Sequence, residues 1–201
     1  MRAAEGAIWR VTEEFGHLKC DVIGDDEPRG VCGSGLVDAV AVALRCGLIS
    51  PSGRIADGKV LPLAGDIFLT QADIRQLQLA KAAISAGIAV LLERWHSSLD
   101  HVETIYLAGA FGNYVSVRSA KQIGLFPCSA DRIVPAGNSA LRGVRKLLGA
   151  GDQRAERIAT IVESVTHVPL ASDPAFFDHY VEQIPFPDVN LGRTFNGEAV
   201  Q

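Results

Sequence analysis

The stretch that most constrains this chain runs from Glu103 to Asn113 and reads Glu-Thr-Ile-Tyr-Leu-Ala-Gly-Ala-Phe-Gly-Asn. Its β-prone residues stop abruptly at Gly109, and Gly112 follows three residues later, which predicts a short strand that ends in a glycine turn. Such an end lets the backbone approach a ligand, because no Cβ is in the way, and ligands of α/β sheets commonly lie beyond the carboxyl ends of strands. A tight turn that uses glycine only for its backbone freedom is the alternative, and the local pattern leaves both open.

The same pattern of strand, glycine, asparagine and helix occurs a second time. Residues 131–134 predict a strand that leads to Gly137, and Asn138 or the residue after it caps a helix that runs to residue 148. Gly143 inside this helix favours close packing against a neighbour. If the two strands are adjacent and parallel, both glycine turns lie on one rim of the sheet.

A glycine-rich start precedes a helix that is apolar nearly all round. Gly33, Ser34 and Gly35 open a run over 36–46 that should be buried on most sides. Ser34 can cap the first turn, and a glycine-rich helix N-terminus favours anionic ligands. Asp38 is either part of such a site or only a favourable charge in the first turn.

A long helix follows a capping box formed by Thr70 and Asp73 and continues to about Arg94. Lys81 lies in the middle of its apolar face, and Gln78 lies at the border. A buried ammonium must snorkel, pair with a carboxylate or meet an anionic ligand, because leaving it unpaired is costly. At 100° per residue, that face comprises Ile74, Leu77, Ile84, Ile88 and Leu91.

The rest of the chain gives an α/β pattern without internal repeats. The other expected elements are a hairpin over 6–11 and 18–23, a surface excursion over 50–65, a strand over 66–69, a helix over 116–122, helices over 152–164 and 173–184, an edge strand over 165–170 and a loosely held tail over 185–201.

Bulk composition excludes several classes of protein. The chain has 201 residues, 48% hydrophobic and 21% charged, with a formal net charge of −4. A mildly acidic balance argues against nucleic-acid or anionic-membrane binding, which need a clustered basic surface. No apolar run approaches the roughly 20 residues of a membrane span, and no signal-peptide layout is present, so we expect a cytoplasmic protein. The four cysteines lack C-x-x-C spacing, and we expect no metal or iron–sulfur site from them.

Several of these stretches together resemble the C-terminal part of the reductive activators of corrinoid proteins. This is the ferredoxin-linked, ATP-dependent family of the acetate and sugar kinase, heat-shock chaperone and actin superfamily. The resemblance implies the second lobe of a ribonuclease H-like, actin-like ATPase domain over 1–184, with a mixed sheet flanked by helices. The motifs that carry it are residues 1–8 (Met-Arg-Ala-Ala-Glu-Gly-Ala-Ile), 30–38 (Gly-Val-Cys-Gly-Ser-Gly-Leu-Val-Asp), 73–82 (Asp-Ile-Arg-Gln-Leu-Gln-Leu-Ala-Lys-Ala), 107–113 (Leu-Ala-Gly-Ala-Phe-Gly-Asn) and 137–140 (Gly-Asn-Ser-Ala).

The resemblance also implies which residues contact ATP or ADP with Mg²⁺. The base and ribose would pack on Gly109, Ala110, Phe111, Gly112 and Asn113, and the helix that carries Gln78 and Lys81 would flank them. The nucleotide would be faced from the other side by Gly33, Ser34, Gly35 and Asp38. The hinge between the lobes would be at Gly137 and Asn138. No catalytic or metal-binding residue of this chain is implied.

In that family a 2Fe-2S ferredoxin domain and a linker precede the nucleotide-binding domain, and Met1 matches an internal methionine of the family pattern. We therefore expect a piece of a longer activator, without a redox centre and with little or no ATPase activity of its own. The implied partners are the corrinoid protein of a methyltransferase system and a second activator chain in a homodimer.

Two other readings remain open. In the first, the chain is mainly a docking or dimerisation module with a vestigial nucleotide pocket, and the helix that carries Phe176, Phe177 and Tyr180 supplies an interface. A small-molecule kinase of the same superfamily is less favoured, because no sugar- or acetate-binding constellation is visible.

Overall fold

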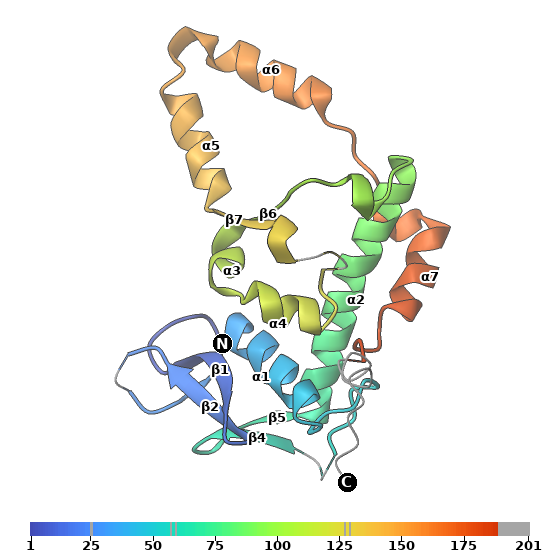
Figure 1. The fold of residues 1–201 in the computed structure, drawn as a ribbon. Coiled ribbons are helices and arrows are strands. Elements are labelled where there is room, and N and C mark those ends of the chain that lie inside the picture. Colours follow the sequence, from blue (N-terminus) through green and yellow to red (C-terminus); the bar gives the residue numbers. More distant parts are fainter. Residues whose placement is uncertain (25, 57, 59, 127, 129, 189–201) are drawn as a thin grey trace.

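The computed structural model describes residues 1–24, 26–56, 58, 60–126, 128 and 130–188 (Figure 1). Its strands are β1 (Ala7–Glu14), β2 (His17–Val22), β3 (Gly30–Val31), β4 (Val60–Ala64), β5 (Ile67–Thr70), β6 (Ile105–Ala108) and β7 (Ile133–Gly137). Its helices are α1 (Gly33–Arg45), α2 (Gln71–Arg94), α3 (Gly109–Tyr114), α4 (Val117–Gln122), α5 (Ser139–Leu148), α6 (Arg154–Ser164) and α7 (Pro174–Glu182).

The α/β class and a mixed sheet are as predicted, and the described strands divide into three small sheets, of which β2–β1–β3 is the mixed one. β1 pairs with β2 antiparallel and with β3 parallel, β4 pairs with β5 antiparallel, and β6 pairs with β7 parallel. β4 lies within the range expected to be an irregular surface excursion, and that expectation was wrong. Proline is disfavoured within strands, so Pro62 in the middle of β4 argued against a strand in the sequence.

The N-terminal hairpin is confirmed, with longer strands than predicted. β1 and β2 meet at Phe15 and Gly16, whose φ angles are +50° and +81°. Two consecutive positive φ values match the right-handed twist of a hairpin. Ile8 and Val11 of β1 are buried in the core.

α1 is the central helix of the core, as its apolar composition predicts (Figure 1). Ser34 does not cap it: the N-cap is Cys32, without a side-chain cap bond. Ser34 Oγ instead donates a hydrogen bond to the Trp9 carbonyl at 2.9 Å. The helix ends before Gly47, whose φ of +71° suits the expected terminator.

α2 begins at the predicted capping box, where Asp73 N donates to Thr70 Oγ1 at 3.2 Å and Thr70 N donates to the Asp73 carboxylate at 2.8 Å. Its buried face differs from the predicted one, since Ile84 and Leu91 are each 47% exposed. A face of smaller residues lets neighbouring segments approach closely. That buried face comprises Ile74, Gln78, Lys81, Ala82, Ser85, Ala86, Gly87 and Val90.

In the described part of the chain, α2 is also the one helix long and apolar enough to cross a bilayer by length and composition alone. However, 44% of its most apolar window is buried inside the protein. It packs along α7, and its residue Ile74 belongs to the hydrophobic core (Figure 1), which is the environment of a core helix.

The C-terminal part differs from its prediction in two places. The edge strand expected over 165–170 was wrong, because residues 165–169 form no strand and a 3₁₀ turn covers Leu170–Ser172. The packed part of the chain extends beyond the expected boundary at residue 184, because Phe186 is buried and its N–H donates to the Pro51 carbonyl at 2.8 Å. The remainder of the expected tail, 189–201, lies outside the described residues.

Candidate functional site

The two glycine turns that were predicted to share one rim are neighbours. β6 and β7 are parallel, and Ala108 at the end of β6 pairs with Gly137 at the end of β7. Gly109 has a φ of +91° and Gly137 a φ of +66°, a region that favours glycine. A Cβ built on Gly137 would lie 3.7 Å from Oδ1 of Asn113, so the second turn touches the segment that follows the first.

The segment after Gly109 is helical instead of an open loop. Residues 109–114 form α3, and Ala110 lies inside it. A Cβ on Gly112 would lie 2.8 Å from Leu107 Cγ, so this glycine lets α3 pack against β6. Asn138 caps α5 by accepting a hydrogen bond from Leu141 N at 3.0 Å, which confirms its predicted capping role.

Gly33 at the start of α1 meets Phe111 of α3. A Cβ on Gly33 would lie 3.0 Å from Phe111 Cε2, and the Phe111 side chain is 45% exposed. The structure therefore brings together two of the segments that were expected to bind a ligand, one from each half of the described chain. A side chain at position 33 would displace the Phe111 ring.

A cavity of about 470 Å³ opens beside this contact. It combines two partly exposed aromatic rings with a cationic side chain and the first turn of α1, which suits a planar base that carries anionic groups. Its lining residues are Met1, Arg2, Ala3, Cys32, Gly33, Ser34, Phe111 and Tyr114.

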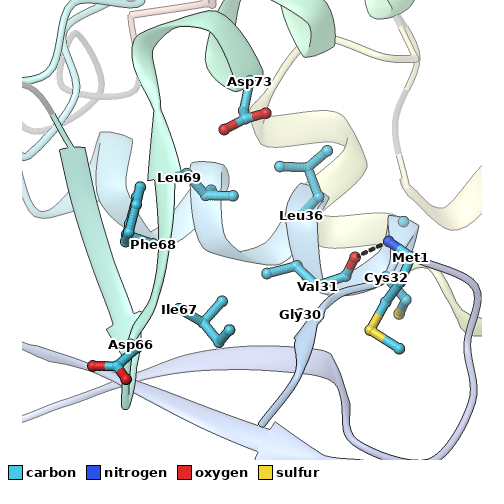
Figure 2. Close-up of a pocket in the computed structure, with 11 residues that line it drawn as sticks. Met1, Gly30, Val31, Cys32, Leu36, Asp66, Ile67, Phe68, Leu69 and Asp73 are labelled. Atoms are coloured by element: carbon cyan, nitrogen blue, oxygen red, sulfur yellow. Dashed lines mark hydrogen bonds between the residues drawn. The ribbon is translucent and has the colours of Figure 1, made fainter.

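A second cavity, of about 620 Å³, lies on the β5 side of the same helix start and shares Met1, Cys32 and Gly33 with the first. Figure 2 shows Asp66 and Asp73 at its two ends, with apolar side chains of β5 between them. A hydrogen bond from the Thr70 hydroxyl lowers the pKa of the Asp73 carboxyl, so this end of the cavity is anionic.

The residues just after Gly33 make their contacts within the protein. A Cβ on Gly35 would lie 2.2 Å from the Ile8 carbonyl oxygen, so α1 crosses β1 in direct backbone contact. Asp38 is buried, and its Oδ2 accepts a hydrogen bond from Val11 N at 3.4 Å. Its Oδ1 has no partner among the described residues, and burial raises the pKa of this carboxyl. Asp38 lines neither cavity.

Gln78 and Lys81 are not brought to the Gly33–Phe111 contact. Gln78 Nε2 donates to the Ser52 carbonyl at 3.2 Å, and Lys81 Nζ donates to the Pro185 carbonyl at 2.5 Å. Burial lowers the pKa of the Lys81 ammonium from 10.5 to about 8. Both side chains hold α2 to flanking segments of the chain, which is a structural use of the polar positions that the sequence singled out.

Sequence reasoning missed Arg2 and Tyr114 at the first cavity. Tyr114 is 61% exposed and follows the glycine motif directly. An aromatic residue directly after the motif that was expected to bind a ligand was an available signal. Arg2 offered none, because its place beside α1 depends on the fold.

Comparison with known proteins places the chain in a family. The model of the C-terminal domain of RACo, the ASKHA domain, matches residues 1–196. The solved structure of a reductive activator for corrinoid, iron-sulfur protein superposes with a TM-score of 0.81 at 30% identity, covering 98% of this chain and 35% of that one.

Two curated relatives agree with that match. The chain is 36% identical to the corrinoid activation enzyme RamQ of Eubacterium limosum, over 94% of this chain and 36% of RamQ. It is 29% identical to the Co(II) methylated amine-specific corrinoid protein reductase of Methanosarcina barkeri, over 80% of this chain and 30% of that protein. The chain thus spans about a third of the length of each relative. It belongs to the family of reductive activators of corrinoid proteins and corresponds to their C-terminal ASKHA domain.

Proposed function

We propose that this chain is the nucleotide-binding second lobe of a longer, cytoplasmic, ATP-dependent and 2Fe-2S ferredoxin-linked activator. That activator would reduce the inactive Co(II) form of a corrinoid protein in a methyltransferase system. The names of the relatives support the reductive role. The observation that carries the nucleotide role is the contact of Gly33 with Phe111 beside an aromatic-lined cavity.

The described residues fit one side of a nucleotide. Phe111 and Tyr114 would stack on the base, and Arg2 would attract the anionic groups. The turns at Gly109 and Gly137 would let the backbone approach the ribose. Ser34 lines the cavity, although its hydroxyl donates to the Trp9 carbonyl. The proposal leaves Gly35, Asp38, Gln78 and Lys81 out of direct contact, because they line neither cavity and their contacts are internal. Phosphate and Mg²⁺ ligands would come from the first lobe.

Where the structure describes this chain, its residues do not fit an iron–sulfur cluster. Among the described residues, no group of three or more His, Cys, Asp or Glu side chains could hold a metal ion. The electron would therefore come from another part of the activator. ATP assists an uphill reduction only by favouring one conformation of the activator–corrinoid complex. Closure of the two lobes on nucleotide, with the turn at Gly137 as the hinge, would supply that change, and we expect the activator to work as a homodimer.

The proposal predicts that ADP stabilises the activator and that Phe111→Ala weakens this effect. At about 100 times its dissociation constant, ADP should add about 2.7 kcal/mol to the free energy of unfolding. Loss of the stacking ring should reduce the affinity for ADP about tenfold, which corresponds to about 1.4 kcal/mol. Thermal unfolding of the longer activator, titrated with ADP, measures both.

Phe177→Ala is the matched control, because Phe177 is also an exposed phenylalanine but lies on α7. Its ADP titration should equal that of the wild type. Absence of any ADP shift in the longer activator would contradict the nucleotide role and would favour the docking-module reading.

A further inference from the structure

One buried acidic side chain has no part in the proposed site. Asp38, in the middle of α1, is 5% exposed, and its neighbours Val37 and Ala39 are buried with it. The side chain of Asp173 is almost as well buried, at 8% exposed, but Arg94 lies 2.6 Å from it. None of the ion pairs found in the described ranges includes Asp38. A carboxylate that is buried without a cation is costly, because no charge replaces the water that it loses.

The Asp38 carboxyl lies where α1 meets both β1 and α4. Oδ2 accepts the hydrogen bond from Val11 N of β1, and Oδ1 has no partner among the described residues. The other buried side-chain oxygen without a partner in these ranges is Gln122 Oε1 on α4, the helix that packs against α1. The hydroxyl of Ser119, which interacts with the Asp38 carboxyl, comes three residues before Gln122 and thus from the same side of α4. Both oxygens without a partner are acceptors, so this helix contact lacks a hydrogen-bond donor.

The surroundings of Asp38 do not hold its carboxyl in the charged form. Burial has the largest effect and raises the pKa above its ordinary value of 3.8. Hydrogen bonding by the Ser119 hydroxyl and the Val11 N–H lowers the pKa. The positive charges of Arg10 on β1 and Arg45 on α1 lower it further, but burial outweighs all four groups. Other titratable groups on the elements packed against α1 are not among those that shift this pKa: Lys19 and Asp21 on β2, Tyr114 on α3, and Arg118 and Lys121 on α4.

We propose that Asp38 carries a proton in the folded protein and donates it from Oδ1 to an oxygen of α4, and that loss of this proton loosens α1. A neutral carboxyl supplies the donor that the contact lacks, and it keeps Oδ2 as the acceptor for Val11 N. On ionisation the proton leaves for the solvent, and the carboxylate is then either buried without a partner or reached by water. Either outcome weakens the contact between α1 and α4.

This inference goes beyond the proposed function and does not depend on a bound nucleotide. Asp38 lines neither cavity, but it lies little more than one turn after Gly33 on the same helix. The start of α1 contacts Phe111 of α3, and α4 follows α3 directly in the chain. The two contacts therefore join the same pair of segments. Asp38 is a positioning residue for the start of α1, and its proton controls how firmly that start is held.

The proposal fixes the sign of the pH dependence. Above pH 3.8 the unfolded chain has lost the proton of Asp38, while the folded chain keeps it until the pH reaches the raised pKa. Unfolding therefore releases a proton in this window, and the free energy of unfolding falls as the pH rises. The stabilisation by the neutral carboxyl is fully present below pH 3.8 and is lost as the pH passes the pKa of the folded state.

The test is urea unfolding of the 201-residue chain and of its Asp38→Asn variant from about pH 4 to about pH 8. Asparagine has nearly the same shape, donates and accepts, and does not titrate, so the variant should fold like the protonated wild type. The unfolding constant of the wild type divided by that of the variant should rise up to tenfold per pH unit above pH 3.8. It should level off where the folded carboxyl ionises. At the upper end of the range, amide hydrogen exchange in α1 and α4 should be faster in the wild type than in the variant.

Asp178→Asn is the matched control, because Asp178 also lies within a helix, α7, but is exposed. Its ratio to the wild type should stay flat with pH. In carbon NMR of aspartate-labelled protein, the carboxyl signal that is missing from Asp38→Asn should be the last aspartate signal to move as the pH rises. An Asp38→Asn ratio that is flat or falls with pH would overturn the proposal, because the carboxyl would then be ionised in the fold and Oδ1 would be completed by water or a cation. Equal exchange rates in the two proteins would overturn the loosening of α1.

Discussion

Replacement of Gly35 by alanine should destabilise the protein by about 3 kcal/mol or more, the upper end of the range for overpacked positions. The added Cβ would lie 2.2 Å from the Ile8 carbonyl oxygen and 2.9 Å from its carbon. Both are backbone atoms of β1, so no side-chain rotation relieves the clash. α1 would have to move away from β1, and α1 is the helix around which the core is built.

Urea unfolding of the 201-residue chain measures this effect, and Gly149→Ala is its control. A Cβ on Gly149 would lie 3.7 Å from the Arg145 carbonyl oxygen, an ordinary contact, and its φ of −80° suits alanine. The control should stay within about 0.5 kcal/mol of the wild type. A Gly35→Ala protein as stable as the control would mean that α1 and β1 do not touch as described. It would also return Gly35 to the candidates for ligand contact.

Local signals predicted most of the elements correctly. The capping box of α2 depends on four consecutive residues, and Thr70 and Asp73 form it as the sequence indicates. The parallel rim at Gly109 and Gly137 was also predictable, because two glycine-terminated strands that are adjacent and parallel must end together. These features are decided within one element or one strand pair.

Features decided by distant segments were not predictable. Ser34 has the right identity and position for a cap, but the nearby Trp9 carbonyl takes its hydroxyl. The apolar stripe that includes Ile84 looked like the buried face of α2, yet a face of mostly smaller residues is buried instead. Distant segments cover that face: the Gly124 carbonyl accepts from Ser85 Oγ, and Leu170 lies beside Gly87. In both cases a tertiary contact outweighs a local preference, and one sequence does not reveal which segment supplies it.

The same limit applies to the candidate site. The contact of Gly33 with Phe111 joins two motifs that the sequence identified one by one. Their proximity was implied only by the family resemblance, which assigns both motifs to one nucleotide. Gln78 and Lys81 were also identified correctly as unusual polar groups in an apolar helix. Their partners are the carbonyls of Ser52 and Pro185. A polar group on a buried face predicts that some partner exists, but not whether the partner is a ligand or the backbone.

Lys81 should make the protein more stable at alkaline pH than at neutral pH. Burial lowers its pKa in the folded protein from 10.5 to about 8. Between these two values the unfolded chain binds the proton and the folded chain does not, so the free energy of unfolding rises with pH. The cost of burying the ammonium is fully present below about pH 8 and is relieved as the pH approaches 10.5.

The Lys81→Met variant isolates this effect, because every other titrating group is common to both proteins. Urea unfolding at several values from pH 7 to pH 10 gives the difference in stability between wild type and variant. That difference should change by about 2 kcal/mol in favour of the wild type between pH 8 and pH 10. Methionine nearly matches the lysine stem and fills the same space next to Phe186. A difference that stays flat with pH would show that the ammonium reaches water, which is incompatible with its enclosure by α2 and the Pro185 carbonyl.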